Sequence, residues 1–443
     1  MKTKTKWLVT LTIALSFFSI RTFADTAKTP MRDITALEFV KGMAPGMNLF
    51  NTLDANAIAS WAPEGLGQET IWGNPKTTQP MVQGMADRGF KTLRIPVTWY
   101  NHMGAAPEYK IDEAWMDRVE EVVNYAFEAD MYVILNLHHE DLHPGKDEKK
   151  GSWLCPTYAK KDANIAQLKK VWTQVATRFK DYGDYLIFET MNEPRVVGSK
   201  QEWNGGSTEH RNVINAYNKA AIETIRATGG NNAKRFIMCP QVGANTVSAK
   251  SHFGNFYKDL GDDRIILSVH SYDPYLFCLA DKKEWGTPAE VNNLRNNINN
   301  WGGHFKRLGI PVVMGEWGAG DHGNYADRIK LYDETVKACK ANDVTPITWI
   351  TSYDRATQTW TQPLIEDAIM KHYLDDPTGL EEAAPIKPFV QMGNVLQFAE
   401  PTQVVIYDIL GSIIHNGIVS EYQLQVRGVY VIVTTNGNYK IVY

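Results

Sequence analysis

The sequence has few long apolar runs. The extended run near the amino terminus, Trp7–Ile20, is 14 residues long, whereas a membrane-spanning helix needs about 20. Three lysines precede this run, and a small-x-small triplet, Thr22-Phe23-Ala24, follows it. This arrangement is typical of a secretory signal peptide. We therefore expect residues 1–24 to be a signal peptide, the protein to be secreted or held at the cell surface, and the exported chain to have no membrane span.

An excess of basic residues is also missing. The formal net charge is −4, and it becomes −8 when residues 1–24 are removed, because that segment carries three Lys and one Arg and no acid. Binding to nucleic-acid phosphates requires a basic surface. The charge therefore argues against a nucleic-acid partner.

Cysteine is scarce. The chain has four, Cys155, Cys239, Cys278 and Cys339, and their spacing matches no zinc-binding motif. Export permits disulfides, and four cysteines allow three complete pairings. Disulfide bridges and buried free thiols both remain open at this point.

The composition, 44% hydrophobic and 22% charged, is that of a globular protein. Eight apolar segments resemble strands buried on both faces: Gly42–Leu49, Lys91–Val97, Met131–Leu137, Tyr185–Thr190, Arg235–Cys239, Arg264–Val269, Ile310–Gly315 and Pro346–Ile350. Amphipathic helical patterns lie between them, among them Trp115–Glu128, Ile165–Phe179, Asn212–Thr228 and Asp327–Ala341. This alternation predicts an α/β protein with a (β/α)8 TIM barrel over residues 25–375. A doubly wound open sheet is the alternative, but no glycine-rich nucleotide turn follows the first segment.

Beyond residue 375 the character of the sequence changes. Residues 376–388 contain Pro377, Pro385 and Pro388 and indicate a linker. Short strand-like runs follow, separated by turn residues such as Asn436-Gly437. We expect residues 389–443 to form a small all-β sandwich.

Seven of the eight predicted strands end in residues suited to a functional site. They are Asn48, Arg94, His138, Asn192 with Glu193, His270 with Tyr272, Glu316, and Trp349. The fifth segment, which ends near Cys239-Pro240, contributes nothing obvious. In a TIM barrel the carboxyl ends of the strands form the active site. These side chains are therefore expected to gather at one end of the barrel.

Two of these residues are glutamates, which suits the hydrolysis of a glycosidic bond. That reaction needs one protonated carboxyl and one ionised carboxylate. Glu193 and Glu316 follow the fourth and seventh strands, so we expect them to face each other about 5–5.5 Å apart.

The residues around the glutamates suit the same reaction. Arg94 is expected to keep one glutamate ionised and Tyr272 to orient the same oxygen, while His138 and His270 adjust the other glutamate. Two further residues are expected to contact the sugar: Asn192 through its 2-hydroxyl, and Trp349 by stacking.

A metal site is the main alternative for the histidines. His138-His139-Glu140, with His143 nearby, is rich in possible ligands. Adjacent residues of a strand point to opposite faces, so His138 and His139 are not expected to share an ion. We therefore expect neither a metal nor a cofactor.

The motifs around these residues resemble those of glycoside hydrolase family 5. They are Leu93-Arg94-Ile95-Pro96, Leu137-His138-His139, Met191-Asn192-Glu193-Pro194, His270-Ser271-Tyr272 and Gly315-Glu316-Trp317-Gly318. Gly46-Met47-Asn48-Leu49, Asn51-Thr52-Leu53-Asp54-Ala55 and Trp72-Gly73-Asn74-Pro75 look like subfamily 4, a group of endoglucanases, xyloglucanases and mixed-linkage glucanases. The resemblance covers about residues 40–375.

The resemblance implies roles for individual residues. Glu193 would be the acid/base and Glu316 the nucleophile of a retaining reaction without metal. Asn48, His139 and Trp349 would bind substrate, and Arg94, His138, Asn192, His270 and Tyr272 would support catalysis. Two positions depart from the family pattern: Phe50 stands where Gly is expected, and Trp349 lacks the usual following Asn-Gly.

The last 58 residues resemble the sorting domain of the type IX secretion system of Bacteroidetes. Val405-Ile406-Tyr407-Asp408-Ile409-Leu410-Gly411, Gly428-Val429-Tyr430-Val431-Ile432 and Tyr439-Lys440-Ile441-Val442 match its repeats and its end. A carbohydrate-binding module is the alternative, but the segment has no Trp for a sugar platform. The resemblance implies the secretion machinery of a Gram-negative bacterium as a partner.

The sequence thus favours an endo-acting β-1,4-glucanase that cleaves cellulose, mixed-linkage glucan or xyloglucan. A β-mannanase or xylanase on the same barrel remains an alternative, as does a non-catalytic polysaccharide-binding protein. A monomer is expected.

Overall fold

The computed structural model describes residues 31–57, 64–142, 152–373, 389–392, 394–408, 412–426, 428–434 and 437–442. The predicted signal peptide, residues 1–24, and the predicted linker, residues 376–388, lie outside these ranges. The chain divides into two compact units, Met1–Asp375 and Asp376–Tyr443.

The first unit contains a closed barrel in which eight strands follow one another in chain order. Each strand pairs in parallel with the next, and β8 closes the barrel on β1. The strands are β1 Gly46–Asn48, β2 Thr92–Ile95, β3 Tyr132–Asn136, β4 Leu186–Glu189, β5 Ile237–Asn245, β6 Ile265–His270, β7 Val312–Glu316 and β8 Val344–Thr348. The predicted TIM barrel is therefore confirmed.

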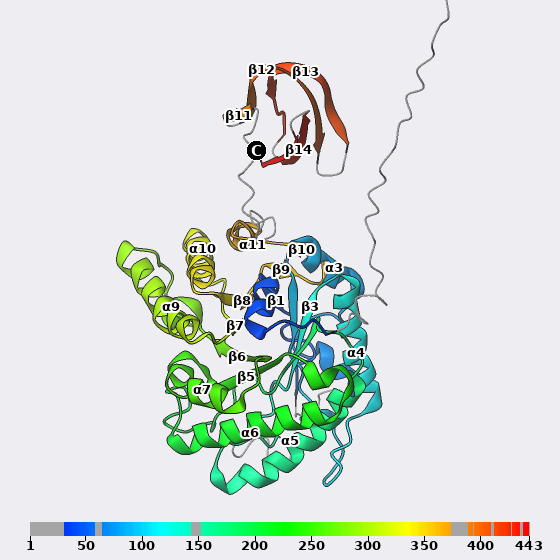
Figure 1. Cartoon of the computed structure of the whole chain (residues 1–443), viewed down its shortest axis with the longest axis vertical. Helices are drawn as coiled ribbons and strands as arrows, with labels where there is room; N and C mark the ends of the chain where they lie inside the picture. The colour runs from blue at the N-terminus through cyan, green and yellow to red at the C-terminus, as the bar shows by residue number, and fades with distance from the viewer. Residues whose placement is uncertain are drawn as a thin grey trace, which may run out of the picture. The chain divides into compact units, whose positions relative to one another are not determined.

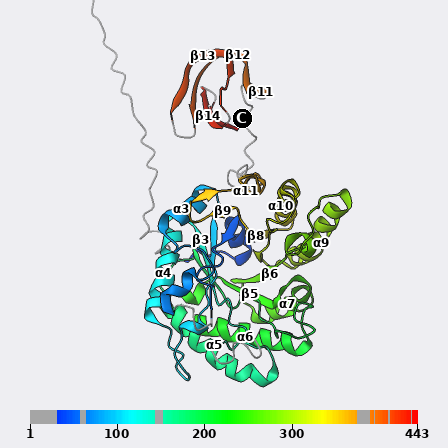
Figure 2. The ribbon, with the colours of Figure 1, turned by 180° about the vertical axis from the view of Figure 1, so that it is seen from behind.

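Helices lie outside the strands in both views of the ribbon (Figures 1 and 2). They are α3 Gln79–Asp87, α4 Glu113–Glu128, α5 Tyr158–Arg178, α6 Thr208–Ala227, α7 Thr246–Leu260, α8 Tyr275–Cys278, α9 Pro288–Leu308, α10 Tyr325–Ala341 and α11 Leu364–Met370. Short 3-10 helices cover Val40–Gly42, Gly65–Thr70, Tyr100–His102 and Gly230–Lys234, and a two-stranded ribbon joins β9 Tyr353–Asp354 to β10 Thr359–Trp360.

Polar side chains cap the amino ends of several helices. Asp112 accepts the backbone N–H of Ala114 at the start of α4, and Ser207 accepts that of His210 at the start of α6. A cap satisfies a backbone donor that has no partner inside the helix. This is why both helices begin two to four residues before the apolar pattern that predicted them.

The barrel interior is apolar at the amino ends of its strands. A core there consists of side chains from the strands, from α2 Ala36–Phe39 and from residues shortly before β1 and β5: Ala36, Phe39, Val40, Met43, Tyr132, Ile134, Ile187, Phe236, Met238, Ile266, Val313 and Ile347. Phe39 stacks on Phe236 with 3.8 Å between ring centroids. Because this apolar core fills the barrel at the amino ends of the strands, the polar side chains lie at the carboxyl ends.

The second unit is an antiparallel sheet of five strands with its own apolar core. The strands are β11 Phe389–Met392, β12 Val395–Asp408, β13 Ile413–Gln423, β14 Val429–Thr434 and β15 Gly437–Val442. The expected all-β character is present, and the pairing joins all five strands in one sheet rather than two. β12 pairs with β11, β13 and β14, so this long strand is the centre of the unit.

All four cysteines are free thiols. Burial raises the pKa of the Cys239, Cys278 and Cys339 thiols, which suits an inert packing role. Within the described residues, no helix has the length and apolar character that crossing a membrane requires.

Candidate active site

The candidate site lies at the carboxyl ends of the barrel strands. Arg94 belongs to β2, while His270 and Glu316 are the last residues of β6 and β7. Glu193 follows β4 by four residues. A carboxylate oxygen of Glu193, one of Glu316 and a ring nitrogen of His270 lie within 4.8 Å of one another. The barrel thus brings together residues that are up to 222 positions apart in the chain.

Glu316 accepts hydrogen bonds on both carboxylate oxygens. Arg94 Nη1 donates to Oε1 at 2.9 Å, and the Tyr272 hydroxyl donates to Oε2 at 3.0 Å. Tyr272 therefore orients the oxygen opposite to the one that Arg94 holds, not the same oxygen as expected. His138 Nε2 lies 3.9 Å from Oε1, so His138 adjoins Glu316 rather than the other glutamate. Burial keeps the pKa of His138 well below its usual value and that of Tyr272 well above, so both remain uncharged.

Glu193 contacts two other basic groups. His270 Nδ1 lies 2.7 Å from Glu193 Oε1, and Arg195 Nη1 lies 4.0 Å from Oε2. The spacing between the two carboxylates, within 4.8 Å for their nearest oxygens, is close to the ~5–5.5 Å of retaining glycosidases and well below the ~6.5–9.5 Å of inverting ones.

An acid/base Glu193 is expected to be protonated at rest and a nucleophilic Glu316 to be ionised, but the pKa values of the two glutamates shift in the opposite directions. Burial raises the pKa of Glu193, but the His270 hydrogen bond and the charges of His270, Arg195 and Arg94 outweigh it, so the pKa is lowered. Burial raises the pKa of Glu316, and the charge of Glu193 adds to this effect, against the opposing influence of His270 and Arg94. Although burial opposes it, the two glutamates raise the pKa of His270. These shifts favour a proton on His270, one hydrogen bond away from an ionised Glu193, in the ligand-free site.

A buried network beneath the glutamates fixes Arg94. Its Nε donates to Glu189 at 2.8 Å, and Glu189 also accepts from Asn136 at 2.9 Å and Ser268 at 2.6 Å. Arg94 and Glu189 are fully buried. The sequence analysis did not identify Glu189. Its place at the end of β4 was a usable signal, since a charged side chain inside a barrel needs a partner of opposite charge.

Asn48 and Asn192 both accept a hydrogen bond from Arg94, but only Asn192 keeps donors for the cleft. Asn48 is 1% exposed, accepts from Arg94 Nη1 at 2.9 Å and donates to the carbonyls of Gly315 and Thr348. Because its polar atoms are used inside the barrel, the expected direct role of Asn48 in substrate binding does not fit its position. Asn192 Oδ1 accepts from Arg94 Nη2 at 2.7 Å, which leaves its amide N–H groups for a sugar.

A cavity of about 730 Å³ opens over the glutamates. It is lined by Glu193, Trp203, Gly243, Asn245, Thr246, His270, Ser271, Tyr272, Asp273, Tyr275, Leu279, Glu316, Trp349 and Ile350. Three of these residues come from β5 or directly follow it. The sequence predicted a fifth strand that ended near Cys239, whereas β5 continues to Asn245 and does reach the site.

Trp349 lines this cavity and packs against two other rings. The His138 ring is parallel to it at 5.5 Å, and the Phe50 ring lies 5.7 Å away on a tilt of 38°. The guanidinium of Arg355 lies 4.7 Å from the centre of the Phe50 ring and donates to the Phe50 carbonyl at 2.7 Å. Phe50, the departure from the family pattern, therefore adjoins the expected sugar platform.

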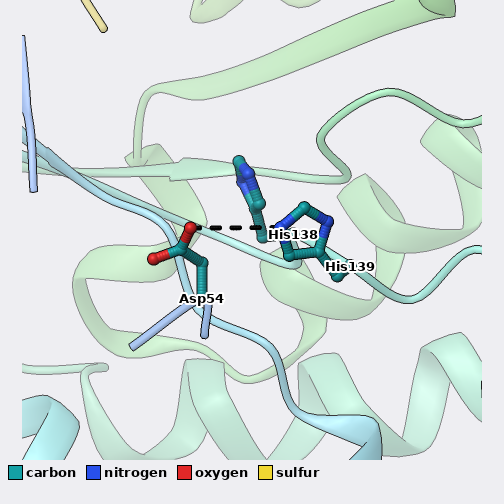
Figure 3. A group of neighbouring side chains, drawn as sticks. All are labelled: Asp54, His138 and His139. Carbon is teal, nitrogen blue, oxygen red and sulfur yellow. Dashed lines mark ion pairs between the residues drawn. The ribbon is translucent and has the colours of Figure 1, made fainter. Parts of the chain in front are cut away.

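His139 lies beside His138, as Figure 3 shows, with their ring centroids 4.4 Å apart. The expectation that the two rings point to opposite faces was wrong, because β3 ends at Asn136 and strand alternation no longer applies. Possible ligand atoms of Asp54, His138 and His139 lie within 4.8 Å of one another. However, both carboxylate oxygens of Asp54 accept backbone N–H groups, from Asn51 and Thr52. Asp54 therefore fixes the loop that follows β1, and His138 and His139 lie beside this loop.

The barrel and its closely spaced glutamates define a glycoside hydrolase. Residues 54–355 match the model of the cellulase family, glycosyl hydrolase family 5. The chain belongs to this family.

Curated relatives and solved structures agree with this assignment. Endoglucanase B of Clostridium cellulovorans is 43% identical over 369 residues, which cover 80% of this chain and 79% of the relative. A GH5-4 broad specificity endoglucanase from Ruminococcus champanellensis, solved with bound cellotriose, is 40% identical with a TM-score of 0.70, over 77% of this chain and all of the other. A xyloglucan-specific endo-β-1,4-glucanase from a metagenomic library, in complex with cellotriose, is 36% identical with a TM-score of 0.67, over 76% and 98%.

Proposed function

We propose that the chain is a retaining endo-β-1,4-glucanase that cleaves β-glucan chains by double displacement. The observation that carries this proposal is the pair Glu193 and Glu316, whose nearest carboxylate oxygens lie within 4.8 Å at the mouth of the barrel. That spacing leaves no room for a water between glutamate and sugar, so one glutamate attacks the anomeric carbon directly.

In the first step, a Glu316 oxygen bonds to the anomeric carbon while the glycosidic bond breaks. Arg94 and Tyr272 hold this carboxylate in place. The leaving oxygen takes a proton from Glu193. That proton reaches Glu193 from His270 along their 2.7 Å hydrogen bond, which leaves His270 neutral.

In the second step, water attacks the anomeric carbon and the bond to Glu316 breaks. Glu193 takes the proton from the water and passes it back to His270 along their hydrogen bond, so both carboxyl groups and His270 return to their starting states. Asn192 binds the sugar 2-hydroxyl, His138 and His139 contact the sugar next to it, and Trp349 stacks beneath the ring. None of these roles involves a metal or a cofactor.

The names of the relatives favour a glucan over a mannan or xylan. Endoglucanases, a lichenase and a xyloglucan-specific glucanase are among them. Carboxymethyl cellulose, lichenan, xyloglucan and mannan should each be incubated with the enzyme, and reducing ends and product anomers measured. New β-anomers from a glucan are expected. Inverted anomers, or cleavage of mannan alone, would overturn the proposal.

For residues 389–443 we propose a role in export through a type IX secretion system from a Bacteroidetes-like cell. The sequence repeats at 405–411 and 428–432 support it, and so does the end of the family match at residue 355. The unit has a core of its own, with Leu396, Val404, Ile406 and Ile432 among its fully buried residues. The same proposal includes a signal peptide over residues 1–24, a linker over 376–388 and a monomeric enzyme.

A further inference from the structure

Trp203 is a large apolar side chain that is exposed to solvent within the candidate active-site cavity. Its exposed fraction is 54%, and it lies between β4 and α6, in the segment that follows Glu193. The ring lines the same cavity of about 730 Å³ as Glu193, Glu316 and Trp349. A large apolar ring inside a functional cleft is a surface to which the apolar face of a sugar can bind.

Arg195 holds this ring in place. The guanidinium carbon lies 4.5 Å from the ring centroid, a cation–π contact. Arg195 itself is fixed, since it donates to Asp141 at 2.7 Å, to the Glu193 carbonyl at 2.9 Å and to Glu202 at 3.1 Å. A ring with few orientations loses little entropy when a ligand binds. Trp203 is therefore a preformed surface that is linked through one side chain to Glu193.

The position of Trp203 indicates which half of the substrate it meets. The proton donor must lie beside the oxygen of the departing chain. Trp203 is joined to Glu193 through Arg195, whereas Trp349 packs against His138, which adjoins Glu316. The two tryptophans therefore lie toward opposite glutamates.

We propose that Trp203, backed by Arg195, is the stacking platform for a glucose of the leaving-group half of the glucan. This inference rests on the proposed glucanase function and assigns one more residue to its substrate specificity. The same platform holds a sugar acceptor when a hydroxyl of another chain, rather than water, releases the sugar from Glu316.

Cellotriosyl fluoride tests this assignment because fluoride replaces the leaving sugar. Glu316 displaces fluoride from the anomeric carbon, and the cellotriosyl group then passes either to water or to added cellobiose, with Glu193 accepting the proton in both cases. The ratio of the two products therefore reports acceptor binding and is independent of the strength of Glu193 as a base.

The variants are Trp203→Ala, Trp203→Phe, and Leu308→Ala as a control that removes an exposed apolar side chain from the end of α9. Trp203→Ala should lower the ratio of transfer to hydrolysis about tenfold, equivalent to ~1.4 kcal/mol, while fluoride release stays within about twofold of wild type. It should lower kcat/KM for cellohexaose by a similar factor. Trp203→Phe keeps a flat ring and should retain most of the ratio, and Leu308→Ala should match wild type.

Two results would overturn the platform. Equal losses of fluoride release and of cellohexaose cleavage would make Trp203 a support for the catalytic groups, and an unchanged transfer ratio would remove it from sugar binding. In both cases the wild-type enzyme still cleaves cellohexaose, so the glucanase function stands. A wild type that cleaves neither substrate would overturn the glucanase proposal and the platform together.

Discussion

Three titratable side chains, Glu193, His270 and Glu316, occupy a space in which their ligand atoms lie within 4.8 Å. Two carboxylates at this distance cannot both be ionised without a compensating charge. Arg94 supplies one positive charge beside Glu316, and His270, whose pKa the two glutamates raise, supplies another beside Glu193 when it is protonated. Glu193 and Glu316 are chemically identical, so their different roles depend on which basic side chain each one contacts.

Replacement of each glutamate should separate the two roles. Glu193→Ala should lower activity on cellohexaose by about 10²–10⁴-fold because the general acid is lost, yet keep activity on aryl cellosides whose leaving group needs no proton. Added azide should accelerate this variant and yield a β-glycosyl azide, because azide attacks without a general base. Glu316→Ala should form no such product, because no covalent intermediate precedes the attack. Identical behaviour of the two variants would contradict the roles.

The pH dependence follows from the raised pKa values of Glu316 and His270. Glu316 must be ionised to attack, and its pKa is raised above 4.5, so activity should fall on the acid side at a pH above that value. The proton held by His270 and Glu193 must be present, and the pKa of His270 is raised above 6.5, so activity should fall on the alkaline side above that pH. A profile of kcat/KM, with circular dichroism at each pH to exclude unfolding, checks both limbs. An acid limb below pH 4.5 would refute the assignment.

Removal of metal tests the group formed by Asp54, His138 and His139. Since backbone N–H groups already engage both oxygens of Asp54, treatment with EDTA followed by dialysis should leave kcat and the melting temperature unchanged. A loss of activity that zinc or calcium restores would contradict the metal-free mechanism.

At the scale of whole elements, the ends of the strands decide the shape of the cleft. β5 continues to Asn245 and brings backbone and side chains to the cavity, and the segment after β1 places Phe50 beside Trp349. Both features lie where a strand passes into a loop. Such junctions adapt one barrel to different glucans without a change in the catalytic pair.

Phe50 should limit the room for branches next to the Trp349 platform. In Phe50→Gly the ring that packs at 5.7 Å from Trp349 is removed, so a xylose-bearing glucan should gain relative to an unbranched one. We expect the ratio of kcat/KM for xyloglucan over carboxymethyl cellulose to rise roughly three- to tenfold, or about 0.7–1.4 kcal/mol. Phe50→Leu keeps apolar bulk at this position and serves as the matched control. An unchanged ratio in a folded Phe50→Gly variant would show that the ring does not face the substrate.

At the scale of the whole molecule, the chain consists of two compact units, and the boundary falls at residues 375/376. Each unit has its own apolar core, and the candidate site is built from the first unit alone. Units of this kind fold and act independently when few contacts cross the connection.

Truncation after Asp376 should therefore leave kcat/KM and the range of substrates nearly unchanged in the purified enzyme. In the native host the same truncation should retain the protein in the periplasm, because the export signal is lost. Activity assays on the purified forms and cell fractionation provide the two readouts. If the truncated enzyme lost its affinity for insoluble glucan while export stayed normal, the second unit would be a carbohydrate-binding module.

The sequence by itself determined the order of the eight strands, four of the helices and most of the site residues at the strand ends, but not the end of β5 or the role of Glu189. It could do so because strands buried on both faces are continuously apolar, as in Tyr132–Asn136, and because the catalytic motifs are local in the chain. Glu193 and Glu316 were therefore identifiable before any distance between them was known.

The tertiary structure alone decided which side chains contact one another and in which direction the pKa of each glutamate shifts. Asn48 looked like a substrate ligand, but closure of β8 on β1 buries it against the Thr348 and Gly315 carbonyls. His270 at 2.7 Å from Glu193 reverses the expected order of the two glutamate pKa values. Both outcomes depend on contacts between residues 77 or more positions apart. The pattern along the chain predicts which strand ends meet, but not which side-chain atoms contact one another there.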